Sequence, residues 1–191
     1  FTYIGNLDVI GNGKKYLWAT DNSILTKINQ ETYETNVVFE NPFKNQNLYF
    51  KSTLVDSSEN QIWMGIDNGL ILFDIDTEEY QFFEIQSDKK YPLINLLKDK
   101  EGNIWTSSFS EILMFSPKTN EFEIYPSGQG VSISRFFDKS CVECGNGDLV
   151  FGGQDGFLRF SPNNITKSDY NPPIRFTKLS IANNEISPST R

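Results

Sequence analysis

The chain has 191 residues, 38% of them hydrophobic, and its 17 basic and 25 acidic side chains give a formal net charge of −8. A globular chain of this length buries roughly 70% of the surface that its unfolded form exposes, so a folded core is expected and disorder is disfavoured. The acidic balance disfavours nucleic acid and anionic membrane surfaces as partners. Histidine is absent, which excludes Ser-His and Cys-His nucleophile pairs.

Four segments of the chain superimpose on one template of turn, short apolar run, second turn and second alternating run. Their aromatic anchors are Trp18, Trp63, Trp105 and Phe151, which are separated by 45, 42 and 46 residues. A period of about 44 residues suits a four-stranded propeller blade or a helical HEAT-type pair. Two turn sequences favour the propeller blade, Asp67-Asn68-Gly69 and Asp155-Gly156. Such groups between alternating runs predict tight β-hairpins.

Further strand-like runs at 52–55, 80–83, 94–97 and 122–125 complete these units, and no segment has sustained helical periodicity. The sequence therefore predicts an all-β fold of β-propeller blades, each with four antiparallel strands, over residues 1–168. About four blades are expected, the last one incomplete, because residues 161–173 offer no outer strand. Two open sheet edges favour self-association of the chain, and a closed four-bladed propeller is the alternative.

The segments LVDSSENQIWMGIDNGLILFD (54–74) and LLKDKEGNIWTSS (96–108) resemble the two-component regulator propeller repeat. CVECGNGDLVFGGQDGFLRFSPNNI (141–165) resembles the final repeat of that family. NPPIRFTKLSIANNEIS (171–187) resembles the first strand of the tyrosine-rich immunoglobulin-like domain that follows such propellers. Residues 169–191 are accordingly predicted to be a linker and the start of that domain.

The resemblance implies a periplasmic sensor of a Bacteroides-type hybrid two-component system, in the ectodomain of an inner-membrane protein. It would detect oligosaccharides released from glycans and signal to a histidine kinase outside this chain. Family propellers commonly have seven blades, about 300 residues at this period, so the chain resembles the C-terminal part of one propeller. The missing initiator Met also suggests an excised piece.

The partners implied are an oligosaccharide, the remaining blades, the immunoglobulin-like domain and a second copy in a homodimer. Membrane attachment would come only through a transmembrane helix of the parent protein. We expect no catalysis by this chain, since it lacks histidine and a kinase domain. The alternatives are a propeller for protein–protein contact or receptor dimerisation and a glycan-active hydrolase or lyase.

No catalytic residue, metal ligand or cofactor site is predicted. Cys141 and Cys144 have the spacing of a zinc or redox pair, but no second cysteine pair or histidine completes a zinc site, so they are interpreted as packing residues. Asp99 and Asp56 precede hairpin turns, which their side chains are expected to stabilise by hydrogen bonds to the backbone.

Ligand residues are expected in the junctions between repeats, at 40–50, 86–93 and 126–138, because such loops lie on the face where ligands approach a propeller. The candidates are aromatic or cationic and depart from the repeat template: Lys44, Tyr49, Lys51, Tyr91, Arg135 and Phe137. Flat aromatic faces suit sugar rings, and Lys or Arg would suit an acidic glycan. The alternative is that Tyr49, Tyr91 and Phe137 pack between blades.

Overall fold

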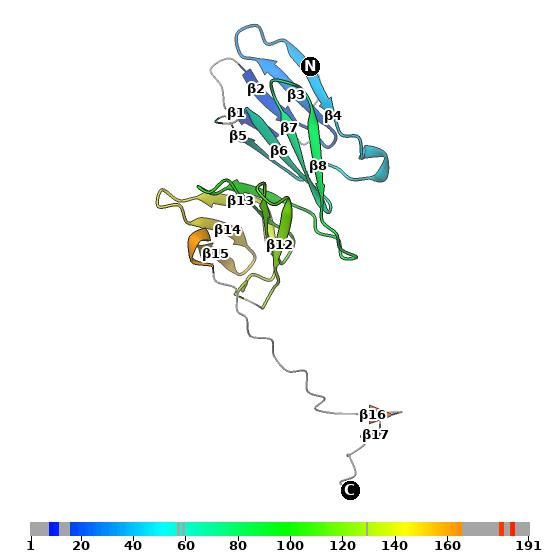
Figure 1. The fold of residues 1–191 in the computed structure, drawn as a ribbon, viewed down its shortest axis with the longest axis vertical. Coiled ribbons are helices and arrows are strands. Elements are labelled where there is room, and N and C mark those ends of the chain that lie inside the picture. Colours follow the sequence, from blue (N-terminus) through cyan, green and yellow to red (C-terminus); the bar gives the residue numbers. More distant parts are fainter. Residues whose placement is uncertain are drawn as a thin grey trace.

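The computed structural model describes residues 8–11, 16–56, 58, 60–128, 130–165, 180–181 and 184–185. Within these residues the protein consists of β-strands and two short 3-10 helices, η1 (Lys44–Gln46) and η2 (Pro162–Asn164). Figure 1 shows the strands gathered into successive sheets along the chain.

Three sheets have four antiparallel strands each. The first contains β1 (Asp8–Gly11), β2 (Tyr16–Thr20), β3 (Ile24–Asn29) and β4 (Thr35–Glu40). The second contains β5 (Ser52–Asp56), β6 (Gln61–Ile66), β7 (Gly69–Asp74) and β8 (Tyr80–Glu84), and the third β9 (Asn95–Lys98), β10 (Ile104–Ser107), β11 (Ile112–Ser116) and β12 (Glu121–Tyr125). A three-stranded sheet contains β13 (Phe136–Glu143), β14 (Leu149–Gly153) and β15 (Gly156–Phe160), and β16 (Ser180–Ile181) pairs with β17 (Asn184–Glu185).

In each of the four larger sheets the strands follow one another in chain order, and the first strand lies at one edge. These first strands are neighbours in space: β1 contacts β5, β5 contacts β9, and β9 contacts β13. Four blades therefore stand side by side with the first strand of each innermost. The prediction of an all-β fold of propeller blades is confirmed.

Blade 4 has three strands, and no fourth strand follows β15 among the residues that the structure describes. The predicted boundary near residue 168 and most of the predicted immunoglobulin-like segment at 169–191 lie outside the described residues. The ladder of β16 and β17 is the part of that segment that is described.

Large apolar side chains fill the spaces between neighbouring blades in three clusters. Between blades 2 and 3, the Trp63 and Phe115 rings pack with their centroids 5.8 Å apart. These side chains are 2% and 0% exposed. Because burial of one large apolar side chain contributes roughly 1.5–3 kcal/mol, each blade depends on its neighbours for stability.

The aromatic anchor expected in the fourth repeat is wrong by one residue. Counted from the hairpin turn, Trp63 and Val150 hold the same position in β6 and β14. Phe151 instead pairs with Leu158 and belongs to the cluster between blades 3 and 4. A shift of one residue moves a strand side chain to the opposite face of its sheet. The tryptophan position thus recurs after 45, 42 and 45 residues, with valine in the last blade.

A carboxylate stabilises the hairpin turn between β9 and β10. Asp99 is 7% exposed and accepts hydrogen bonds from the backbone nitrogens of Glu101 and Asn103 at 3.0 and 2.8 Å. It also accepts one from Trp105 Nε1 at 2.7 Å. The turn-stabilising role predicted for Asp99 is confirmed. In blade 2, by contrast, the buried Nε1 of Trp63 has no partner among the described residues.

Replacement of Asp99 by alanine should lower the free energy of unfolding by at least about 2 kcal/mol, because a buried indole N–H and two turn amides lose their acceptor. Asp74→Ala is the matched control. Asp74 likewise accepts the amides of Asp76 and Thr77, but in an exposed turn, so a clearly smaller loss is expected. Urea unfolding measures both variants, and equal losses would contradict the importance of burial at Asp99.

Candidate functional site

The turns between the second and third strands of the blades meet the junction loops that lead to the next blade. Phe50 N donates a hydrogen bond to the Asn22 carbonyl at 2.8 Å. In blade 2, Tyr91 N donates to Asn68 Oδ1 at 2.5 Å. Turns and junctions are therefore gathered on one face of the propeller, called here the junction face.

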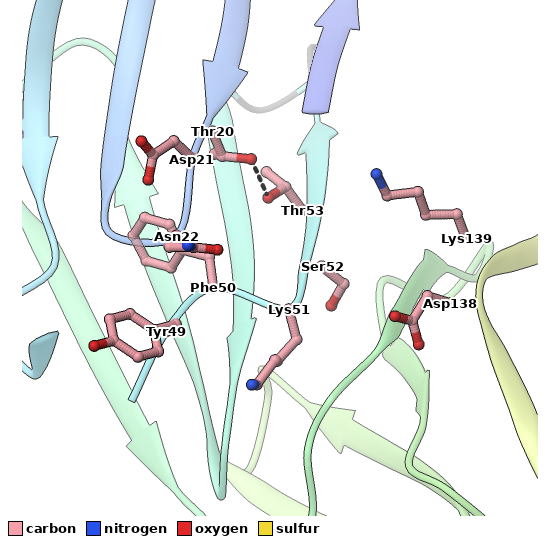
Figure 2. Close-up of a pocket in the computed structure, with 10 residues that line it drawn as sticks. All are labelled: Thr20, Asp21, Asn22, Tyr49, Phe50, Lys51, Ser52, Thr53, Asp138 and Lys139. Atoms are coloured by element: carbon pink, nitrogen blue, oxygen red, sulfur yellow. Dashed lines mark hydrogen bonds between the residues drawn. The ribbon is translucent and has the colours of Figure 1, made fainter. Parts of the chain in front are cut away.

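A cleft of about 490 Å³ opens on the junction face. Figure 2 shows the side chains that line it, which come from three separate parts of the chain. Thr20, Asp21 and Asn22 belong to the end of β2 and the turn that follows, and residues 49–53 to the junction into β5 and its start. Asp138 and Lys139 of β13 form the opposite wall. The cleft thus joins blades 1, 2 and 4.

A bulge in β13 brings Asp138 and Lys139 to the cleft. The ladder between β13 and β14 is interrupted here, so that residues 137–140 stand opposite Gly152 alone. Extra residues in one strand leave the ladder and bend the strand. Lys139 has a φ of 57°, a left-handed conformation that is uncommon for residues other than glycine.

Asn95 of β9 holds this bulge across the boundary between blades 3 and 4. Its Nδ2 donates to the Phe137 carbonyl at 2.9 Å, and its Oδ1 accepts from Ser140 N at 3.1 Å. Nδ2 also donates to Ser107 Oγ at 2.7 Å, and Asn95 is only 2% exposed. One buried amide therefore satisfies backbone groups on both sides of the two cleft residues.

The cleft contains charges of both signs. On one wall are Asp21, which directly follows β2, and Lys51, whose Nζ lies 4.0 Å from Oδ1 of Asp67 outside the lining. Asp138 and Lys139 add one charge of each sign on the other wall (Figure 2). Hydroxyl groups lie between the walls, including Thr53 Oγ1, which hydrogen bonds with a neighbouring threonine at 3.1 Å. The site can therefore donate and accept hydrogen bonds from both sides.

The structure brings two of the six predicted ligand residues, Tyr49 and Lys51, into this cleft. Phe137 directly precedes Asp138 in the bulge and is 48% exposed. This exposure contradicts the alternative interpretation, in which Phe137 packs between blades.

The other three candidates lie elsewhere. The Arg135 guanidinium lies 5.2 Å from the centroid of the Phe109 ring, on the junction face. Lys44 is in η1 and pairs with Glu40. Tyr91 is 8% exposed and belongs to the cluster between blades 2 and 3, as its packing interpretation proposed.

Sequence reasoning missed Asp21, Asp138 and Lys139 as cleft residues. Asp21-Asn22 matches the turn Asp67-Asn68 of the next repeat, so its sequence indicates only a hairpin turn. For the bulge there was no sequence signal, because extra residues in a strand become visible only in its register with the partner strand.

The opposite face of the propeller has a second cleft, of about 520 Å³, lined mainly by residues 98–102. Asp56 of blade 2 forms an ion pair there with Lys98 of blade 3. Burial alone would raise the pKa of Asp56, but hydrogen bonds from Lys98 and Ser58 outweigh it and hold the pKa below its usual value. This pair links the two blades.

Cys141 and Cys144 are free thiols. Cys141 Sγ contacts the Leu96 carbonyl at 3.9 Å, and burial raises its pKa to about 11 although that contact acts in the opposite direction. A thiol with this pKa is a poor nucleophile. No group of three or more His, Cys, Asp or Glu side chains that could hold a metal ion occurs in the part of the chain that the structure describes.

No family model matches the chain. Histidine kinase P4 of Formosa agariphila is 27% identical to it over 111 residues, which make up 57% of this chain and 8% of that kinase. The extracellular domain of a putative hybrid two-component system of B. thetaiotaomicron aligns with a TM-score of 0.65 and 22% identity, over 96% of this chain and 24% of that one. The chain therefore spans a small part of both proteins.

Virginiamycin B lyase of Staphylococcus aureus also aligns, with a TM-score of 0.59 and 11% identity, over 82% of this chain and 55% of the lyase. The predicted resemblance to the propellers of two-component receptors is confirmed at the level of the fold. None of the described helices is long and apolar enough to cross a membrane.

In a Cys144→Ser variant, iodoacetamide should alkylate Cys141 at pH 8 at least about 10-fold more slowly in the folded protein than in urea, because the buried thiol is almost fully protonated. Mass spectrometry of timed samples measures both rates. Equal rates in the two states would contradict the packing role of Cys141.

Proposed function

We propose that this chain is part of the periplasmic sensor domain of a hybrid two-component receptor, and that it binds an oligosaccharide in the cleft on the junction face. The receptor assignment rests on the alignment of 96% of the chain with one such extracellular domain. The 27% identity to a histidine kinase supports it. Phosphoryl transfer would occur elsewhere in the parent protein, because this chain has no histidine to accept the group.

The chemistry of the cleft supports a sugar as ligand. The carboxylates of Asp21 and Asp138 can accept hydrogen bonds from sugar hydroxyls, and Lys51 can donate to them. Tyr49 adds an aromatic side chain at the junction, and Phe137 an exposed one beside the bulge. Convergent polar groups with nearby aromatic surface are typical of small-molecule sites.

The same assignment gives the neighbours of this chain in the parent protein. The remaining blades would complete the propeller, and an immunoglobulin-like domain would begin within residues 169–191. Sensing requires no reaction at the cleft, so bound oligosaccharide should be released intact. A homodimer of receptors would transmit the signal across the membrane.

If the cleft binds sugar, Lys51→Ala and Tyr49→Ala should each weaken oligosaccharide binding by at least about 10-fold, or about 1.4 kcal/mol. Lys44→Ala and Tyr33→Ala are matched controls outside the cleft and should leave the affinity unchanged. Calorimetry on the complete ectodomain measures affinity, after a thermal-shift screen of glycan fragments selects the ligand.

Two results would contradict this function. One is a failure of every glycan fragment to raise the melting temperature of the complete ectodomain. The other is the release of new reducing ends during incubation, which would indicate a hydrolase or lyase instead of a sensor.

A further inference from the structure

The charges at the cleft do not favour an anionic ligand. The lining has two carboxylates, from Asp21 and Asp138, and two ammonium groups, from Lys51 and Lys139, so it has no net positive charge. Asp67, outside the lining, lies 4.0 Å from Lys51 Nζ. The chain as a whole has a net charge of −8. A uronate or sulfate group entering the cleft would therefore approach a site without net positive charge on a protein that is already negative.

The guanidinium groups of the described residues lie outside the cleft. Arg135 lies over the Phe109 ring at 5.2 Å, and Arg159 pairs with Asp148 at 2.7 Å. Arginine is the side chain that most often recognises carboxylate or sulfate groups with two parallel hydrogen bonds. Lysine can bind anions as a point charge, but Lys51 already has Asp67 at 4.0 Å.

The bulge in β13 places the carboxylate of Asp138, which can accept hydrogen bonds from sugar hydroxyls, on one wall of the cleft. Its dependence on Asn95 becomes clear from the equivalent position in blade 2. Ser52 begins β5 as Asn95 begins β9, and it donates one hydrogen bond, to the Leu93 carbonyl at 2.6 Å. Asn95 has a longer side chain with both a donor and an acceptor, and it bonds on both sides of the bulge.

We propose that the cleft selects neutral over acidic oligosaccharides, with Asp138 as an acceptor for sugar hydroxyls and Asn95 as the residue that positions it. This inference rests on the proposed function and narrows its ligand class. A neutral sugar can donate to the carboxylates and accept from the ammonium groups without adding charge. Asn95 acts through the backbone of the bulge and does not itself reach the cleft surface, since it is 2% exposed.

The first experiment compares hexasaccharides of glucose, mannose and xylose with those of galacturonic and mannuronic acid, using the complete ectodomain and calorimetry. A neutral hexasaccharide should bind, with affinity that changes less than about 2-fold between low and physiological salt. The acidic hexasaccharides should bind at least about 10-fold more weakly.

The possible failures are distinguishable. Tight, salt-sensitive binding of an acidic hexasaccharide alone overturns this proposal and leaves the proposed function standing. If no member of this series or of the wider glycan screen binds, both the proposed function and the preference for neutral sugars are overturned.

The second experiment tests the positioning role of Asn95. Asp138→Asn and Asn95→Ser should each weaken binding of the neutral hexasaccharide at least about 10-fold. The double variant should bind the neutral hexasaccharide no more weakly than either single variant, because both changes remove the same contact. Asp88→Asn, an exposed change in the 86–93 junction, is the control and should bind normally.

If the losses of affinity in Asn95→Ser and Asp138→Asn add fully in the double variant, the positioning role is overturned. Full addition indicates independent effects, as a general weakening of the fold would give. Urea unfolding of each variant confirms that it is folded under the binding conditions. Unchanged affinity in Asp138→Asn would overturn the role of that carboxylate.

Discussion

Packing of one blade against the next is the interaction on which the rest of this structure depends. A single four-stranded sheet with apolar side chains on both faces, such as Trp63 on one and Met64 on the other, cannot shield either face alone. The Trp63 side of blade 2 is covered by Phe115 of blade 3, and the opposite side by blade 1. This stacking sets the distance between inner strands, and therefore the place where the junction loops meet.

Polar groups at the ends of the strands complete the arrangement without adding much apolar contact. Asp99 satisfies its own turn and the indole of Trp105, whereas Asp56 pairs with Lys98 and so joins blade 2 to blade 3. Asp56 also accepts the backbone N–H of Ser58 at 3.1 Å, so the same repeat position stabilises the turn in both blades, as predicted, and in blade 2 it also contacts the next blade. In blade 2, Asp56 makes no hydrogen bond to the indole, and the buried Nε1 of Trp63 has no partner among the described residues.

The cleft depends on a departure from the repeat. Regular inner strands place their side chains by simple alternation, but the bulge at 137–140 leaves its ladder and is held by a side chain from another blade. In a protein built from similar blades, such a local exception gives one blade a chemistry that its regular neighbours lack. The proposed ligand class follows from this exception and from the charges that surround it.

Much of the architecture could be predicted from the sequence, because strands and hairpin turns are encoded locally. The recurrence of Trp18, Trp63 and Trp105, with turns such as Asp67-Asn68-Gly69, was sufficient to predict blades of four strands and their approximate limits. Residue type alone was not sufficient at Phe151, where the register of the hairpin assigns the tryptophan position to Val150.

For the candidate site, the sequence determined that aromatic and cationic residues of the junctions were worth attention, and Tyr49 and Lys51 do line the cleft. Only the tertiary structure decided that Tyr91 is buried between blades and that Asp21 and Asp138, 117 positions apart, share one site. The physical reason is that local patterns specify strands and turns. Which of those strands and turns meet depends on how whole blades pack, and on one buried amide that bridges two of them.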